Sequence, residues 1–155
     1  MTEATTLFKM ILTDKWDEGT WKVVGQIAIA FAQLEHILWL SPKRIGKLDF
    51  SIWEGMAGMI SIPQRCNQIS DGYAMKNMNQ EREAELENLL KKAIQVNEKR
   101  NSIIHGRWGC KKQNGVVISR HRIWKGRDRG IDVAKLRQLR DHIRELRDQL
   151  GRYPW

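Results

Sequence analysis

The sequence predicts one all-α domain over residues 1–155, an up-and-down bundle of four to five helices with a β-hairpin inserted before the last helix. Apolar residues recur at helical spacing in several segments, most regularly over residues 86–94 and 136–150. The period changes after His105, where two strand-like stretches flank Asn114-Gly115, a pair typical of tight hairpin turns. With 155 residues, 41% of them hydrophobic, the chain is long enough for a single substantial core.

The first half of the chain predicts four helical segments. They lie at residues 2–16, 21–40, about 51–62 and 64–78. Thr20 is the predicted N-cap of the second helix, and Ser41-Pro42 is its predicted stop. Ser51 and Glu54 match a capping box, which opens the third helix.

The second half begins with the longest amphipathic helix. Asn79 is its predicted N-cap, and Gly106 is a common stop signal just after it. The hairpin is expected at about residues 107–124, because short alternating stretches flank its turn. A charged loop is expected over residues 126–130.

The last helix is expected at about residues 132–150, capped by Asp132 and ended by Gly151. Its apolar residues follow 3,4,3,4 spacing, which makes a narrow seam: Leu136, Leu139, Ile143, Leu146 and Leu150. Five positions are compatible with packing on the bundle or on a second subunit.

The net charge of +9 is unevenly distributed. Residues 1–99 hold 12 Lys or Arg against 13 Asp or Glu, whereas residues 100–155 hold 15 against 5. A basic region of this kind favours polyanions, although a solvated basic helix surface would have the same composition. The residues expected to bind RNA are in or next to the hairpin: Arg107, Lys111, Lys112, Arg120 and Arg122.

Cysteine usage and hydropathy predict a cytoplasmic protein. Cys66 and Cys110 form neither a CxxC pair nor a Cys/His cluster, so we expect buried thiols, no metal site and no cofactor. The N-terminus carries Glu3 and no apolar run of the kind found in secretory signals. Residues 23–40 are the most apolar, but polar residues interrupt them, which favours a core helix over a membrane span.

The candidate site lies at the end of the long helix. The apolar face of this helix comprises Leu86, Leu89, Leu90, Ala93 and Ile94. At about 100° per residue, the same face continues through Asn97, Arg100, Asn101 and Ile104. Burying amide and guanidinium groups costs several kcal/mol unless they are paired, so a core-facing stripe that turns polar before His105 predicts a site.

Glu35 is the predicted partner of Arg100. On a helical wheel it falls inside the apolar arc of residues 21–40, between Val24 and Ala28. A carboxylate in that position needs a partner, and Arg100 is the obvious candidate. The alternative is a partly exposed glutamate at the margin of the arc.

Arg100 and His105 together suit metal-independent RNA cleavage. The sequence contains no Gly-rich phosphate loop, paired metal carboxylates or Ser nucleophile motif. Histidine can move a proton near neutral pH, and arginine can bind a phosphate through its bidentate fork. Because cleavage needs both an acid and a base, a two-fold dimer with two copies across one cleft would complete the site.

Residues 100–105, Arg-Asn-Ser-Ile-Ile-His, resemble the R-N-x-x-x-H signature of the HEPN superfamily. These are small helical domains, many of them ribonucleases of toxin–antitoxin, abortive-infection and CRISPR systems. Residues 31–35 also resemble the family's earlier helix, which often carries a polar residue facing the signature. The resemblance implies a homodimer with both signatures at its interface, in which Arg100 and His105 are catalytic. Asn97, Asn101 and Glu35 are the expected supporting residues.

The resemblance further implies a toxin or phage-defence endoribonuclease, with RNA and a possible antitoxin protein as partners. Some toxin members carry R-x-x-x-x-H-x-Y, whose tyrosine is modified by a partner nucleotidyltransferase. Arg107 stands at that position here, which argues against that kind of antitoxin. Two alternatives remain: a non-catalytic HEPN-like module that binds RNA, nucleotide or protein, and a structural dimerisation domain in which Arg100 only pairs with Glu35.

Overall fold

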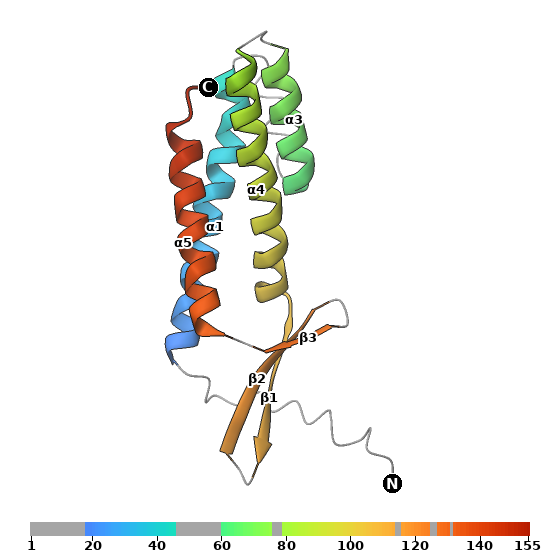
Figure 1. Cartoon of the computed structure of the whole chain (residues 1–155), viewed down its shortest axis with the longest axis vertical. Helices are drawn as coiled ribbons and strands as arrows, with labels where there is room; N and C mark the ends of the chain where they lie inside the picture. Colours follow the sequence, from blue (N-terminus) through green and yellow to red (C-terminus); the bar gives the residue numbers. More distant parts are fainter. Residues whose placement is uncertain (1–17, 46–59, 76–78, 114–115, 125–126, 131) are drawn as a thin grey trace.

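The computed structural model describes residues 18–45, 60–75, 79–113, 116–124, 127–130 and 132–155. The elements in chain order are α1 (Glu18–Ile45), α3 (Ile62–Ala74), α4 (Gln80–Ile104), β1 (Arg107–Gln113), β2 (Val116–Trp124), β3 (Arg127–Gly130) and α5 (Val133–Arg152). The helices form a bundle, and the strands extend from one end of it (Figure 1). The predicted helical bundle is therefore confirmed. The helices predicted over residues 2–16 and from Ser51 lie outside the described residues.

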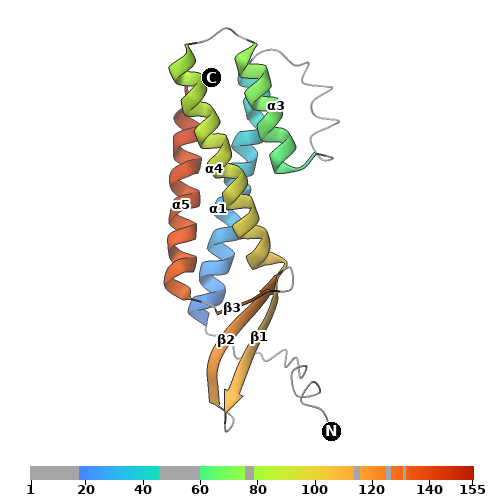
Figure 2. The same cartoon turned by 45° about the vertical axis from the view of Figure 1, so that its right-hand side comes forward.

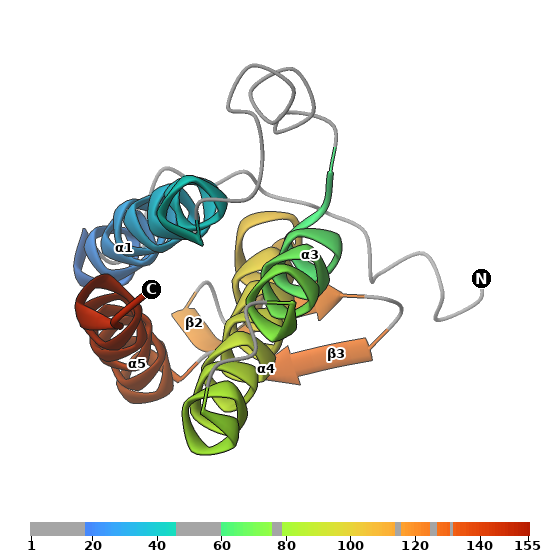
Figure 3. The ribbon, with the colours of Figure 1, turned by 90° about the horizontal axis from the view of Figure 1, so that it is seen from above.

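The described helices do not strictly alternate in direction along the chain. α1, α3 and α5 run one way, and α4 runs the other way (Figures 1 and 2). Seen from above, α5 lies beside α1 at one side of the bundle (Figure 3). α1 and α3 are parallel, but the helix predicted between them lies outside the described residues, so the structure does not test the up-and-down order there. α3, α4 and α5 alternate in direction (Figure 1).

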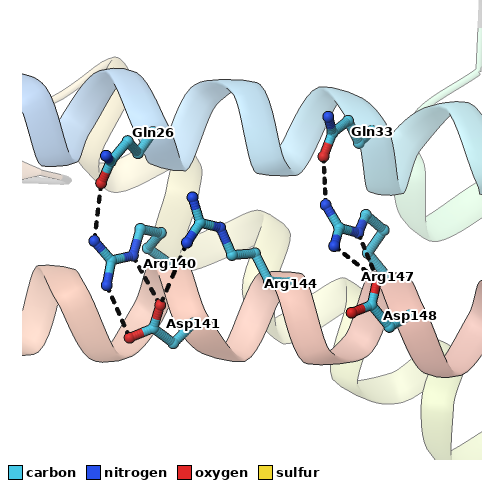
Figure 4. Close-up of polar contacts among 7 residues, drawn as sticks. All are labelled: Gln26, Gln33, Arg140, Asp141, Arg144, Arg147 and Asp148. Atoms are coloured by element: carbon cyan, nitrogen blue, oxygen red, sulfur yellow. Dashed lines mark hydrogen bonds and ion pairs between the residues drawn. The ribbon is translucent and has the colours of Figure 1, made fainter.

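A polar ladder on the surface joins α5 to α1 (Figure 4). Arg140 donates a hydrogen bond of 2.8 Å to the side-chain oxygen of Gln26 and another of 2.8 Å to Asp141. The same arrangement recurs seven residues later with Gln33, Arg147 and Asp148. Both bonds between the helices join residues 114 apart, which shows that α1 and α5 are parallel and in constant register.

The ladder makes stability depend on pH through Asp141. The hydrogen bond from Arg140 lowers the pKa of this carboxyl group. The ionised form therefore stabilises the folded state above the unfolded pKa of about 3.9, and that contribution is lost as pH falls through the lower folded pKa. We expect the difference in free energy of unfolding between wild type and Asp141→Asn to be larger at pH 6 than at pH 2, measured by urea unfolding. A difference that does not shrink in acid would contradict this role.

α1 supplies the central stripe of the core. Many of its buried residues recur every three or four positions: Thr20, Val24, Ile27, Phe31, Leu34, Leu38, Ser41 and Ile45. The repeat continues past both predicted ends of the helix, so the boundaries predicted at Thr20 and Ser41-Pro42 are wrong. Pro42 lies inside the helix, where a proline costs about 3 kcal/mol or more. Burial of Ile45 beyond it offsets that cost, because the stripe reaches one turn further.

α1 is also long and apolar enough to cross a membrane, judged by length and composition. In its most apolar stretch of 18 residues, 39% is buried within the bundle. Trp21 and Ile29, by contrast, are 46% and 63% exposed. A core helix and a membrane span share these properties of length and composition.

Local capping signals determine where α3, α4 and α5 begin. Ser61 and Gln64 form a capping box at the start of α3, in which each side chain accepts a hydrogen bond from the other's backbone N–H. Asn79 and Asp132 cap α4 and α5, and each accepts a 2.9 Å bond from the N–H two residues on. Both predicted caps are confirmed, whereas α3 begins two residues before the predicted Gln64.

The leucine seam of α5 packs inside this bundle rather than on a second subunit. Leu136, Ile143, Leu146 and Leu150 are buried, and Leu139 is half-buried against the same core. The end predicted at Gly151 is wrong, because the helix continues to Arg152. Beyond it, the Tyr153 hydroxyl donates a 2.6 Å hydrogen bond to the backbone carbonyl of Arg82, which anchors the last turn of α5 to the start of α4.

A glycine inside a helix predicts a stabilising substitution at Gly151. A Cβ atom added there would lie 3.5 Å from the side chain of Ile37, which is an ordinary van der Waals contact. We expect Gly151→Ala to raise the free energy of unfolding by about 0.5–1 kcal/mol, because alanine favours the helix and restricts the unfolded chain. Urea unfolding measures this difference, and an unchanged or lower midpoint would contradict it.

The backbone between α4 and α5 forms an antiparallel sheet in the order β1-β2-β3. β1 pairs with β2, with a shift of register between Lys111 and Lys112. β3 pairs with the other edge of β2 and includes most of residues 126–130, for which a loop was expected. That expectation is wrong because the open edge of β2 offers main-chain hydrogen bonds to whatever segment follows it.

Candidate functional site

The last turns of α4 carry the candidate site. The buried side of this helix comprises Leu86, Leu89, Leu90, Ala93, Val96 and Ile103. Arg100 follows Val96 by four residues and precedes Ile103 by three, so it belongs to the same side. It is half-buried, as are Asn97 and Asn101. Polar side chains therefore replace apolar ones on the inner face of α4, as the sequence predicts.

The Arg100 side chain faces α1. Its guanidinium carbon lies 5.0 Å from the centre of the Phe31 ring, in the range of a cation–π contact. Its Nη1 donates a 2.8 Å hydrogen bond to Oδ1 of Asn101. Its Nε is buried and has no hydrogen-bond partner within the described part of the chain. An aromatic ring and an amide thus hold this guanidinium, while its Nε makes no hydrogen bond to the residues that the structure describes.

Glu35 does not form the predicted ion pair with Arg100. No ion pair joins them among the residues that the structure describes. Glu35 is half-buried one turn after Phe31, and the Phe31 ring is what lies against the guanidinium. Because α4 is antiparallel to α1, Glu35 and Asn97 both lie one turn beyond this contact, on the side away from the sheet. The alternative of a partly exposed glutamate is the one observed.

His105 ends α4 and is exposed. Its backbone N–H donates a 2.9 Å hydrogen bond to the carbonyl of Asn101 and so closes the last turn. In an α-helix, residues five apart differ by about 140° in direction. Arg100 therefore points toward α1, while His105 leaves α4 on a different side. One copy of α4 does not aim both groups at the same point.

The five residues expected to bind RNA lie on the two longer strands. Arg107, Lys111 and Lys112 are on β1, and Arg120 and Arg122 are on β2. Residue 120 pairs with Cys110, and residue 122 pairs with Trp108. β1 begins shortly after His105, so these positions continue directly from the candidate site (Figure 1).

A groove between α4 and α5 has no signal in the sequence. Its basic side chains are Lys99 on α4 and Lys135 and His142 on α5. These residues form no motif, because a sheet separates their helices in the sequence. Only the packing of α5 beside α4 brings them together.

The described part of the chain contains no cluster of residues suited to metal chemistry, and its free thiol is buried. No group of three or more His, Cys, Asp or Glu side chains there could hold a metal ion. Cys66 is a free, buried thiol, as predicted, and burial raises its pKa to about 12. A thiol in this state is a weak nucleophile.

The candidate site thus consists of Arg100 and Asn101 against Phe31, with His105 at the exposed end of the same helix. Guanidinium donors beside an imidazole can bind a phosphate and exchange a proton with it. Comparison of the chain with family models, with curated proteins and with solved structures found no match.

Proposed function

We propose that this protein is a metal-independent endoribonuclease of the HEPN type. The observation that carries the proposal is the state of Arg100, which rests on Phe31, bonds to Asn101 and keeps a buried Nε without a partner among the described residues. This guanidinium can bind a phosphate without first breaking an ion pair with a carboxylate. The resemblance of residues 100–105 to the HEPN signature supports the same assignment.

The proposed reaction moves phosphorus from the 5′-oxygen to the 2′-oxygen of the preceding nucleotide. His105 of one copy removes the proton of the 2′-hydroxyl, and the 2′-oxygen forms a bond to phosphorus. The bond from phosphorus to the 5′-oxygen breaks, and a protonated His105 of the second copy gives that oxygen its proton. Arg100 stabilises the charge on the non-bridging oxygens. The products are a 2′,3′-cyclic phosphate and a 5′-hydroxyl.

The proposal includes a homodimer with a composite site. Arg100 and His105 leave α4 on different sides, so an acid, a base and a guanidinium at one phosphate need a second copy of the helix. Exposed Trp21 and Ile29 on α1 give the chain apolar surface of the kind that subunits bury. Sedimentation measures the oligomeric state directly.

The proposal places the enzyme in the cytoplasm, as a toxin or phage-defence protein that acts on RNA and has a possible antitoxin partner. In this proposal, the hairpin inserted before the last helix presents Arg107, Lys111, Lys112, Arg120 and Arg122 to the RNA backbone. The excess of basic residues after residue 99 supports this role.

The test is to incubate the purified protein with single-stranded RNA in EDTA and to analyse the ends of the products. We expect 2′,3′-cyclic phosphate ends from wild type and none above background from His105→Ala. If wild type cleaves no better than the variant, the catalytic proposal is wrong. RNA binding by both proteins without cleavage would then favour the non-catalytic module.

A further inference from the structure

A groove of about 490 Å³ lies between the last turns of α4 and the first half of α5. Three apolar side chains contribute to its lining: Ile103, Leu136 and Leu139. Three cationic or titratable side chains also line it: Lys99, Lys135 and His142. All three of the latter are exposed, whereas Ile103 and Leu136 are buried, so the groove has an apolar floor and a basic rim.

The basic rim of Lys99, Lys135 and His142 forms no ion pair in the part of the chain that the structure describes. None of the described Asp or Glu residues contributes to the lining of the groove. The two rim lysines thus add positive charge beside the groove, which favours an anionic ligand.

Two other cavities in the described part of the molecule lack this property. The cavity between α1 and α5 contains Arg144 and Arg147, but each lies within 4 Å of an aspartate of the polar ladder. The cavity near the chain end contains Glu85 in its lining. The groove between α4 and α5 is thus the better site for an anion.

An apolar floor below a basic rim matches the chemistry of single-stranded nucleic acid. A base can lie against apolar side chains, while the phosphates on either side meet lysines. The volume is within the range of about 300–1,000 Å³ found for small-ligand sites, so it can accept one nucleotide of a strand. Lys99 and Ile103 share the last turns of α4 with Arg100, which places the groove beside the candidate site.

We propose that this groove binds the RNA strand next to the phosphate that is cleaved. Lys99 and Lys135 contact backbone phosphates, and the floor formed by Ile103, Leu136 and Leu139 receives a base. This inference rests on the proposed function, because it takes the same RNA as its ligand. It adds a binding site that α4 and α5 form together and to which the sheet contributes no lining residue among those described.

Charge reversal at the rim tests the groove. The probe is a fluorescent single-stranded oligomer of about 12 nucleotides without 2′-hydroxyl groups, which the proposed reaction cannot cleave. We expect Lys99→Glu/Lys135→Glu to raise its Kd at least about 10-fold and to lower the salt slope by about one unit for each lysine. The matched control is Lys91→Glu/Arg137→Glu, which changes the net charge equally on the same two helices at residues that do not line the groove. It should change the Kd far less.

The outcomes separate this inference from the proposed function. Equal losses of oligomer binding in both double variants would contradict binding in the groove and would indicate a general effect of net charge. Wild-type cleavage of RNA together with unchanged binding by the rim variant would also overturn the groove, while the ribonuclease proposal would stand. If the protein does not cleave RNA but its binding depends on the rim, the ribonuclease proposal would be wrong and the groove would stand. Equal competition by inorganic polyphosphate, per phosphate, would overturn the contact between the floor and a base.

Discussion

Replacement of His105 by alanine is expected to lower the rate constant of RNA cleavage by at least about 10²- to 10⁴-fold, the usual contribution of one general acid or base, because the variant lacks both the proposed acid and the proposed base. The side chain is exposed, so its removal leaves no cavity in the core. The interaction of residue 105 that closes α4 comes from its backbone N–H, which alanine retains. Single-turnover cleavage in EDTA measures the chemical step, and circular dichroism and urea unfolding show whether the bundle is intact.

The matched control is His36→Ala. His36 is also an exposed histidine, and it stacks on Trp39 of its own helix at 6.0 Å between ring centres. It belongs to neither the candidate site nor the groove, so we expect this variant to cleave RNA at close to the wild-type rate. Wild-type activity of His105→Ala, or equal losses in the two variants, would remove His105 from the proposed chemistry.

Replacement of Arg100 by lysine is expected to lower cleavage by about 10²- to 10³-fold, comparable with removal of one transition-state donor. Lysine keeps the positive charge and can still lie over the Phe31 ring, so the cation–π contact need not be lost. It lacks the planar fork that binds two phosphate oxygens at once. A loss of cleavage without a loss of stability would therefore show that cleavage needs the planar guanidinium and not only its positive charge.

Arg137→Lys provides the control for this variant. Arg137 is exposed on α5 and does not line the groove. We expect it to cleave RNA like wild type, with the same urea midpoint. If Arg100→Lys cleaves at the wild-type rate, or loses activity only in proportion to a loss of folded protein, Arg100 has a structural role only.

Features encoded by a few neighbouring residues could be predicted from the sequence. Asn79 and Asp132 each cap a helix through an N–H two residues away, so a short window of sequence contains the whole interaction. The seam of α5 was predictable for the same reason, since its 3,4,3,4 spacing is visible in one segment. Which surface that seam covers depends on the other helices and needed the structure.

Local signals failed where burial of distant surfaces outweighed them. Thr20 and Pro42 are respectively a good cap and a good stop in isolation, but both lie within the buried repeat of α1. Gly151 ends many helices, yet here the anchored Tyr153 extends the last turn past it. In each case tertiary packing favoured a longer helix than the local preference of the chain.

The candidate site was predictable on one helix and not between helices. The helical period placed Arg100 on the inner side of α4, and the structure confirms this position. A helical wheel gives the direction of a side chain but not its height along a neighbouring helix. The wheel therefore pairs Arg100 with Glu35, whereas Phe31 contacts Arg100 in the structure. The groove has no sequence signal, because Lys99 and Lys135 meet only through the packing of α5.

The constant separation of 114 residues between paired positions of α1 and α5 has a consequence for synthesis in the cell. α1 precedes α5 in the chain, and its paired positions are synthesised 114 residues before their partners. Until α5 has been synthesised, the apolar stripe of α1 therefore lacks its α5 partner. Contacts so distant in sequence also slow folding, since a long loop must close before they form. In the proposed ribonuclease, activity would therefore follow the synthesis of α5.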